Sequence, residues 1–276
     1  MTLEHTEPRT WFITGASRGL GRAFTEAALA AGDRVVGVAR DITPLEDLVV
    51  ASAGRLVTFP LDIADRTAVQ AGVRRAFAAF GRLDVVVNNA GGVVLGMLEE
   101  ITEEQARAHL DTNFFGALWV NQAVVPLLRE QGSGHILQVS SMGSAGGFAS
   151  TGLYGAGKAA LDSMSEALAM EVERFGIKVT ILQPGGYRTD LFTLGLTTTA
   201  ENPAYAPLRA WLSELWGESE DYDPRLAAAV VLRVVDLPEP PKRLVLGGAA
   251  YDMVRELVGA RMTALAEWEH LSRQAD

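Results

Sequence analysis

The chain has 276 residues, of which 48% are apolar, and it carries a formal net charge of −10. That charge argues against a broad nucleic-acid or membrane-binding surface, and the absence of cysteine excludes disulfides, thiolate metal sites and cysteine nucleophiles. Residues 1–9 lack the apolar centre of a secretory signal, and no apolar run approaches the ~18 residues of a membrane span. We therefore expect a flexible tail at 1–9 and a cytoplasmic protein without nucleic-acid or membrane partners.

Short apolar runs alternate with helical stretches along the rest of the chain. The predicted strands are residues 10–14, 34–39, 55–59, 83–87, 135–139, 177–182 and 243–246. The predicted helices are residues 20–31, 44–50, 65–80, 103–129, 152–175 and 249–271. Near-continuous Val, Ile and Leu runs are typical of strands buried on both faces, and their alternation with helices indicates right-handed crossovers. The sequence predicts one α/β domain over residues 10–276, a doubly wound, Rossmann-like parallel sheet of seven strands with helices on both faces.

Two segments interrupt this regular pattern. Pro126 should bend or end the long helix 103–129. Residues 185–223 are long, irregular and rich in Thr, Pro and aromatics, which favours a substrate lid. Its aromatic residues either contact an apolar or ring-bearing substrate or pack the lid onto the body. They are Tyr187, Phe192, Tyr205, Trp211 and Trp216.

A glycine-rich loop lies between the first strand and the first helix. Gly15, Gly19 and Gly21 allow a sharp turn and a close approach of the backbone to a pyrophosphate, which the N-terminus of the following helix attracts. The spacing differs from the common G-x-G-x-x-G pattern, and a glycine-rich turn alone is also compatible with a plain tight turn. Its place after a strand and before a helix favours a dinucleotide.

The end of the second predicted strand bears on the choice between NAD and NADP. An acidic residue there would bind a ribose 2′-hydroxyl and indicate NAD, but the strand ends at Arg40, and Arg18 lies in the glycine loop. Guanidinium groups suit a 2′-phosphate, so NADP(H) is favoured, with NAD(H) still possible. Asp41 could bind the ribose if the register is shifted, or could cap the next helix.

Asparagines mark two further positions near predicted strand ends. Asn88-Asn-Ala-Gly91 follows the fourth strand, where it either lines the floor of a cofactor site or forms a simple turn. Asn113 lies within the predicted helix 103–129, where asparagine is a mediocre helix former. A kink or a bound water would explain it, and a solvent-facing amide is the alternative.

Tyr154 and Lys158 are four residues apart on one predicted helix, so their side chains project from the same face. An ammonium group near a phenol favours the phenolate and should lower the pKa of the tyrosine from about 10. Ser140 and Ser141 end the fifth strand, and a serine hydroxyl there can hydrogen-bond a substrate oxygen. The group predicts acid–base chemistry by Tyr154.

These residues together resemble the short-chain dehydrogenase/reductase family, of the compact single-domain kind, over Thr10 to Leu246. The matching motifs are Thr14-x-x-x-x-Gly19-x-Gly21 with Gly15, Asp62, Asn88-Asn-Ala-Gly91, Asn113, Ser141, Tyr154-x-x-x-Lys158, and Pro184-Gly185 followed by Thr189. Gly155-Ala-Gly157 departs from the family, which more often has Ser-Ala-Ser there. The resemblance implies the strand order 3-2-1-4-5-6-7.

The resemblance also implies the roles of the site residues. Tyr154 would be the general acid or base, Ser141 would orient the carbonyl, and Lys158 would bind the nicotinamide ribose, with Asn113 holding a relay water. Ser141 is preferred to Ser140 because the family's serine usually precedes the tyrosine by thirteen residues. The implied cofactor-binding residues are Gly15, Ser17, Arg18, Gly19, Leu20, Gly21, Arg40, Asp62, Ile63, Asn89, Ala90, Gly91, Tyr154, Lys158, Pro184, Gly185 and Thr189.

The sequence therefore predicts an NADP(H)-dependent oxidoreductase that transfers a hydride between nicotinamide and a carbonyl or alcohol. A non-catalytic NADP-binding regulatory or scaffold protein is the main alternative, and dehydration or epimerisation with a tightly held cofactor is a third. The four histidines lack metal-ligand spacing, so no metal is expected, and His109 is expected to be an ordinary helix-face residue. The resemblance implies a homodimer or homotetramer paired through the helices 103–129 and 152–175.

Overall fold

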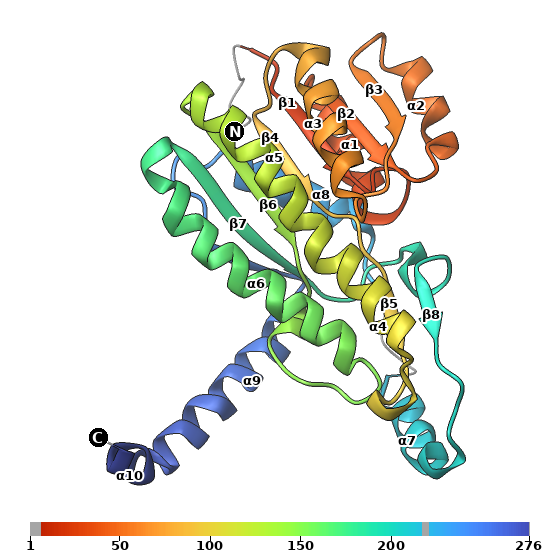
Figure 1. Ribbon diagram of the computed structural model, residues 1–276, viewed down its shortest axis with the longest axis vertical. Coiled ribbons are helices and arrows are strands. Elements are labelled where there is room, and N and C mark those ends of the chain that lie inside the picture. The colour runs from red at the N-terminus through yellow and green to blue at the C-terminus, as the bar shows by residue number, and fades with distance from the viewer. Residues whose placement is uncertain (1–6, 217–220, 276) are drawn as a thin grey trace.

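The computed structural model describes residues 7–216 and 221–275. Its centre is a sheet of seven parallel strands in the order β3-β2-β1-β4-β6-β7-β9 (Figure 1). The strands are β1 (Thr10–Thr14), β2 (Arg34–Ala39), β3 (Leu56–Pro60), β4 (Val85–Asn88), β6 (Gly134–Val139), β7 (Ile177–Pro184) and β9 (Arg243–Leu246). Counted within this sheet, the order is 3-2-1-4-5-6-7, so the predicted Rossmann-like fold is confirmed.

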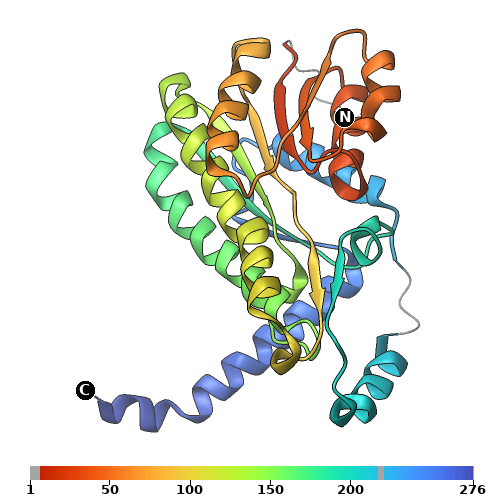
Figure 2. The same ribbon diagram turned by 45° about the vertical axis from the view of Figure 1, so that its right-hand side comes forward.

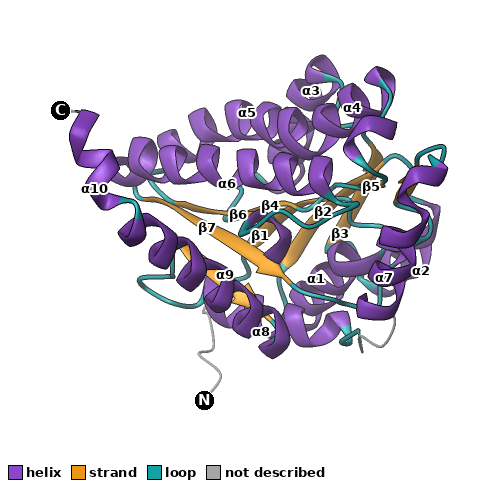
Figure 3. Ribbon diagram, turned by 90° about the horizontal axis from the view of Figure 1, so that it is seen from below, coloured by secondary structure: helices purple, strands orange, loops and turns teal. Residues whose placement is uncertain are grey.

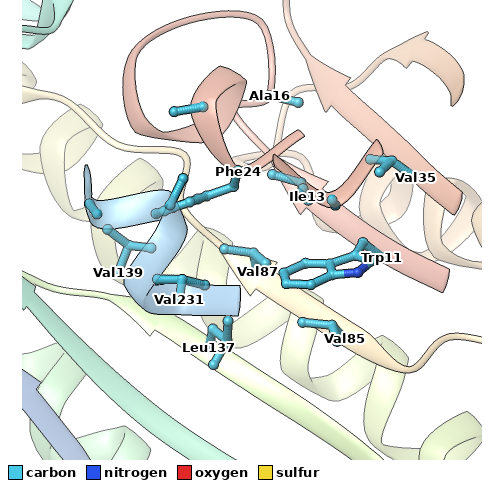
Figure 4. Close-up of a cluster of buried hydrophobic side chains, with 14 of the residues drawn as sticks. Trp11, Ile13, Ala16, Phe24, Val35, Val85, Val87, Leu137, Val139 and Val231 are labelled. Atoms are coloured by element: carbon cyan, nitrogen blue, oxygen red, sulfur yellow. The ribbon is translucent and has the colours of Figure 1, made fainter. Parts of the chain in front are cut away.

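Helices cover both faces of the sheet (Figure 3). They are α1 (Gly19–Ala30) and α8 (Pro224–Val235) on one face, and α3 (Arg66–Phe80), α5 (Gly116–Gln131) and α6 (Gly152–Val172) on the other. Successive residues of β1 serve the two layers: Trp11 and Ile13 pack with α1 and α8 (Figure 4), and Phe12 packs with α3 and α5. Both faces of the strands are therefore buried, which explains their continuous apolar composition.

Local signals set the ends of most helices. The carboxylate of Asp65 accepts hydrogen bonds from the backbone N–H groups of Thr67 and Ala68 and so caps the start of α3. Gly81 ends that helix with a φ of 76°, which glycine adopts without steric cost. The short α2 (Glu46–Ala51) is preceded by a 3-10 turn at Thr43–Leu45. These ends lie close to the predicted ones.

The predicted helix 103–129 consists of three consecutive segments. They are α4 (Glu103–Leu110), a π-helical segment (Asp111–Phe115) and α5. Pro126 does not end the helix, which continues to Gln131 and stops at Gly132, where φ is 72°. A proline removes only one backbone N–H, and the packing of α5 against α3 and α6 maintains the helix beyond it.

Several elements were not predicted from the sequence. β5 (Val93–Leu95) and β8 (Leu196–Thr198) form a small parallel sheet beside the main one. α7 (Ala206–Trp216) lies within the predicted lid. The missed α8 does have a readable start, since the Asp223 side chain accepts from the Arg225 N–H and Pro224 occupies the first helical turn.

The two ends of the chain differ in how they are held. Much of the tail predicted at residues 1–9 lies outside the described residues, but Arg9 forms ion pairs with Asp33 and Asp236. At the other end, α9 (Gly248–Glu267) and α10 (Glu269–Ser272) leave the body of the molecule as a C-terminal arm, residues 248–272 (Figures 1 and 2). Within the described part of the chain, no helix is long and apolar enough to cross a membrane.

Candidate active site

The glycine-rich loop makes a tight turn at the carboxyl end of β1. Gly15 and Gly19 have φ values of 64° and 54°, a region that side chains rarely adopt. A Cβ on Gly21 would lie 2.1 Å from the carbonyl oxygen of Gly15, so a larger residue would open the turn. α1 begins at Gly19 and directs its first backbone N–H groups towards this turn, which is the arrangement that binds a pyrophosphate.

The loop after β4 is fastened directly to the glycine loop. Asn89 donates from Nδ2 to the carbonyl oxygens of Thr14 and Gly15, at 2.9 and 3.1 Å. The Thr14 hydroxyl in turn accepts from the backbone N–H groups of Asn89 and Ala90. Asn89 was expected to bind the cofactor; in the structure its side chain holds the two loops together. Thr14 was matched only as part of a motif, and its role emerges from these contacts.

The residues expected to choose between NAD and NADP lie in the glycine loop and after β2, and Asp62 follows β3. Within the described chain, neither Arg18 nor Arg40 has an ion-pair partner, and Arg40 is exposed. The Asp41 carboxylate accepts a hydrogen bond from the Thr43 N–H, which lowers the pKa of Asp41 and makes it a cap of the following turn. Asp62 accepts in the same way from the N–H of Ala64.

Three of the predicted cofactor-binding residues direct their side chains inward. Ile63 is buried in the core beneath α3 and α5, and Leu20 packs against the core beneath α1. Ser17 is also buried. Any contact that Ile63 makes with a ligand is therefore through main-chain atoms.

Asn113 occupies the π-helical segment between α4 and α5, and its side chain is buried. Its Nδ2 donates to the backbone carbonyl of His109 at 3.0 Å, and its Oδ1 accepts from the Gly92 N–H at 3.3 Å. Of the two explanations left open by the sequence, the solvent-facing amide is therefore wrong. Short π segments often occur at functional sites.

His109 lies one helical turn before Asn113 and is also buried, which corrects its expected place on an ordinary helix face. Its ring meets that of Tyr154 edge-on, with 6.1 Å between the centroids. Burial, and then the charge of Lys158, lowers the pKa of His109 to about 4. The spacing of four residues between His109 and Asn113 is the sequence signal that could have identified it.

Ser141, Tyr154 and Lys158 meet where β6 ends and α6 begins. Tyr154 and Ser141 are joined by a side-chain hydrogen bond, and Ser141 also accepts from the Gly143 N–H at 3.0 Å. Ser140 points elsewhere and donates to the carbonyl oxygen of Lys158 at 3.4 Å. Of the two adjacent serines, Ser141 is therefore the one whose hydroxyl contacts Tyr154.

Burial dominates the electrostatics of this group. The Lys158 ammonium donates to the carbonyl oxygen of Val139 at 2.8 Å, and burial lowers the pKa of Lys158 to about 8, against the opposing charge of Asp162. Burial raises the pKa of Tyr154, and the hydrogen bond from Ser141 only partly offsets it. The expected lowering of the Tyr154 pKa by Lys158 is thus wrong here, because the Lys158 Nζ lies 6.0 Å from the phenol ring centre and is bonded to a carbonyl.

Gly91 joins the cofactor loops to this acid–base group. A Cβ on Gly91 would lie 2.7 Å from Oδ1 of Asn113 and 3.5 Å from Nζ of Lys158. On the other side, Thr189 faces the glycine loop, since a Cβ on Gly19 would lie 3.1 Å from its Cβ. The glycine loop and the predicted site residues therefore lie together at the carboxyl edge of the sheet, where doubly wound folds bind ligands. These residues are Asn113, Ser141, Tyr154, Lys158 and Thr189.

The segment beyond β7 begins as part of the body and then spreads over this edge. Pro184 ends β7, and the Gly185 N–H donates to the carbonyl oxygen of Leu246 at 3.0 Å. Arg188 and Thr189 line one side of a cleft of about 620 Å³, and Arg22 of α1 and Arg225 of α8 line the other. The cleft therefore lies between the glycine loop and the predicted lid.

The predicted lid is attached to the body through Glu100. Its carboxylate accepts from the Asn202 N–H at 2.8 Å and from the Thr199 hydroxyl at 3.0 Å, and pairs with Arg209 at 2.5 Å. The Arg209 guanidinium, with these further hydrogen bonds, lowers the pKa of Glu100 to about 2. Sequence analysis had not assigned Glu100 a role, because its partners lie about a hundred residues away.

The lid aromatics divide between the two roles left open by the sequence. Tyr187 is buried in the core near Tyr222, with 6.0 Å between ring centroids. Phe192 and Trp211 are about half exposed, at 52% and 54%. The side chain of Trp216 lies outside the described residues. Packing therefore explains Tyr187 but not Phe192 or Trp211.

Comparison with known proteins gives a consistent picture. A family model described as short chain dehydrogenase matches residues 9–197. The chain is 39% identical over 269 residues to a protein named oxidoreductase BOA17 from Botryotinia fuckeliana, covering 96% of this chain and 98% of that one. It is 32% identical over 260 residues to a 3-ketodihydrosphingosine reductase from Bacteroides thetaiotaomicron, covering 87% and 88%. The crystal structure of a short-chain dehydrogenase from Streptomyces avermitilis matches with a TM-score of 0.92 and 41% identity, over 99% of this chain and 100% of that one.

Proposed function

The chain belongs to the short-chain dehydrogenase family, and we propose that it is an oxidoreductase that uses NADP(H) to interconvert a carbonyl and an alcohol. The observation that carries this proposal is the hydrogen bond between Tyr154 and Ser141 beside a buried Lys158, at the same sheet edge as the glycine loop. An acid–base group of this kind has no use in a protein that only binds a nucleotide.

The residues at the sheet edge fit a dinucleotide. The N-terminus of α1 and the tight turn at Gly15 and Gly19 offer backbone N–H groups to a pyrophosphate. Gly91 has no side chain, which allows its backbone to lie against the Asn113 carboxamide with the Lys158 ammonium nearby. When bound there, a nicotinamide dinucleotide supplies or accepts the hydride.

The protein's own groups handle the proton. In reduction, the Tyr154 hydroxyl donates its proton to the carbonyl oxygen of the substrate as the hydride reaches the carbon, and the Ser141 hydroxyl hydrogen-bonds the same oxygen. In oxidation, the phenolate of Tyr154 takes the proton back. Lys158 is buried beside this pair, with its ammonium on the carbonyl oxygen of Val139, and its proposed role is to bind the nicotinamide ribose.

The preference for NADP(H) over NAD(H) rests on Arg18 and Arg40. Neither guanidinium group has an ion-pair partner among the described residues, so both can pair with a 2′-phosphate. Asp41, the competing ribose ligand, is engaged with Thr43. Replacing Arg40 with Asp should reduce the ratio of kcat/KM for NADPH to that for NADH by about tenfold or more, the value of one charge-assisted contact. Arg233→Asp, on α8, is a control for the change in net charge. An unchanged ratio of NADPH to NADH efficiency in Arg40→Asp would show that Arg40 does not contact the 2′-phosphate.

Residues 185–223 form the proposed substrate lid. Glu100 anchors the segment to the body, and the exposed Phe192 and Leu194 present apolar surface on it. Such surface favours an apolar or ring-bearing substrate.

A homodimer or homotetramer is proposed as the working assembly. Phe115 at the start of α5 and Met170 of α6 are exposed, which supports pairing through these helices. The C-terminal arm offers a second surface, because Tyr251, Val258 and Met262 are exposed at helical spacing, with Leu265 one turn further. The arm points away from its own body (Figure 2), and an isolated helix is marginally stable, so a second copy is the partner proposed.

Light scattering on two arm variants tests this interface. Met262→Asp places a charge in the apolar stripe of the arm and should lower the mass of the assembly or weaken it by about tenfold or more, because a buried unpaired charge is costly. Ala260→Asp adds the same charge to the opposite face and should leave the mass unchanged. Equal masses for the two variants would show that the arm is not part of the interface.

Titration of the purified protein with NADPH and NADH tests the main proposal. The absorbance of the reduced nicotinamide is then followed with a panel of ketones and aldehydes. Tight NADPH binding with carbonyl-dependent oxidation supports the reductase. Binding without turnover over a broad panel would favour a regulatory or scaffold protein, and product formation without net cofactor consumption would favour dehydration or epimerisation.

A further inference from the structure

His109 is a buried titratable group that the proposed reaction does not use. It lies on α4, one turn before Asn113 and beside Tyr154, and its side chain is almost completely enclosed, at 5% exposed. Its Nδ1 is 3.2 Å from Nδ2 of Asn113. Buried polar atoms normally have partners, but Nε2 of this ring has none within the described chain. An imidazole in such a place therefore needs an explanation.

Hydrogen bonding determines the protonation of this ring. The N–H of Gly92 requires an acceptor, which must be Oδ1 of Asn113, so the amide nitrogen faces His109. One amide hydrogen goes to the His109 carbonyl oxygen, and the other is left for Nδ1. Nδ1 can accept it only when unprotonated. The ring is therefore neutral with its proton on Nε2, in agreement with the lowered pKa of His109.

The ring fits because residue 157 is glycine. A Cβ on Gly157 would lie 3.1 Å from Nε2 and 3.5 Å from Cδ2 of His109, closer than side chains normally approach. Gly157 is on the same helix as Tyr154 and immediately precedes Lys158. The imidazole thus fills the gap between α4 and α6, with one edge on the Asn113 amide and the ring against the phenol of Tyr154.

We propose that His109 is a positioning residue, which fixes the carboxamide of Asn113 through Nδ1 and supports the ring of Tyr154. This inference rests on the proposed oxidoreductase function for its effect on turnover, but not for the tautomer or the contact with Asn113. Without the imidazole, the Asn113 amide keeps its bonds to the Gly92 N–H and to the backbone carbonyl of residue 109 but loses the partner of its second amide hydrogen, so it is held less rigidly.

Two variants of nearly equal shape separate positioning from packing. Leu and Asn side chains have the same branching, but only Asn carries an oxygen on Cγ, where histidine carries Nδ1. His109→Leu should lower kcat about tenfold, the worth of one buried hydrogen bond, with the KM for NADPH changed less than about twofold. His109→Asn should recover most of that loss. Arg74→Leu, at an exposed position of α3, is the control and should behave as wild type.

Nitrogen NMR of the histidine rings supplies a readout that needs no turnover. The His109 signal, identified by its loss in His109→Asn, should show the neutral Nε2–H tautomer from pH 5 to 8. Leu and Asn variants of equal kcat, or a His109 ring with its proton on Nδ1, would overturn the proposal. If the wild-type protein turns over no carbonyl, the oxidoreductase function fails and the tautomer alone decides the role of His109.

Discussion

The acid–base side of the molecule and its outer surfaces are built in opposite ways. Around α4 and α6, the polar groups Asn113, Ser141 and Lys158 are each less than a tenth exposed and are held by hydrogen bonds to neighbouring elements. On the lid and the C-terminal arm, large apolar side chains such as Phe192 and Met262 are more than half exposed. The chemistry of the first region is therefore set within the chain, whereas the second region presents surface to other molecules.

Because of this difference in burial, substitutions in the two regions should affect different properties of the protein. Burial shifts the pKa values of Tyr154, Lys158 and His109, so a small displacement there alters proton transfer. The lid is held by the Glu100 contacts, by the pairing of β8 with β5 and by the buried Tyr187, so removal of the Glu100 charge should leave the acid–base group in place. Three predictions test whether the two regions are separable in this way.

The largest effect is expected from Tyr154→Phe, which removes the proposed proton donor and keeps the ring. We expect activity with any carbonyl substrate to fall by about a thousandfold, the scale of general acid catalysis, because Phe has no proton to give. NADPH affinity, measured by fluorescence titration, should change less than about twofold. Unchanged turnover would show that Tyr154 takes no part in the reaction. A large loss of NADPH affinity would show that the substitution also disturbs cofactor binding.

A smaller effect is expected from Glu100→Gln, which removes the charge that pairs with Arg209. The lid loses a charge-assisted hydrogen bond, so the substrate KM should rise by about tenfold while kcat falls less than about threefold. Limited proteolysis should cut sooner within residues 185–223. Glu104→Gln, on the exposed start of α4, is the matched control. A fall in kcat as large as the rise in KM would mean that the lid and the acid–base group are coupled.

The last prediction concerns the effect of burial on stability in mild acid. Burial lowers the pKa of His109 to about 4 and that of His135 to about 3, so the unfolded chain binds more protons than the folded one below pH 6.5. Stability should therefore fall as pH decreases from 6.5, by about 2 kcal/mol per histidine at pH 5. Glu100 stabilises the folded state as a charged carboxylate, and its pKa is lowered to about 2 in the folded protein. Its contribution to stability is therefore lost only below pH 4.5, as the pH approaches 2.

Denaturant unfolding at pH 7 and pH 5 tests this assignment. His135→Gln should remove roughly half of the loss, and Glu100→Gln should leave the loss between these two pH values unchanged. A wild-type protein that is equally stable at both values would contradict the buried neutral histidines.

Much of the framework could be read from local patterns. The seven sheet strands lie within two residues of their predicted ends, because short runs of Val and Ile between glycines and polar turns favour buried strands. Tyr154 and Lys158 were placed on one helix face by their spacing of four residues, and Ser141 was placed at the end of the preceding strand. The missed α8 had a readable signal in Asp223 and Pro224.

Other features required contacts between distant parts of the chain. β5 and β8 are three residues each and are about a hundred residues apart, so neither has a local pattern long enough to identify it. The role of Glu100 depends on Arg209, and that of His109 on the space at Gly157.

The sequence by itself indicated the parallel sheet and the glycine loop, because period and turn chemistry are local properties, and its motifs implied the strand order and the proposed acid–base residues through the family resemblance. Only the tertiary structure decided the direction of the Tyr154 pKa, the burial of His109 and the exposure of the C-terminal arm. The physical reason is that burial depends on which distant segments cover a side chain. The pattern of residues adjacent in the sequence does not specify which distant segments those are.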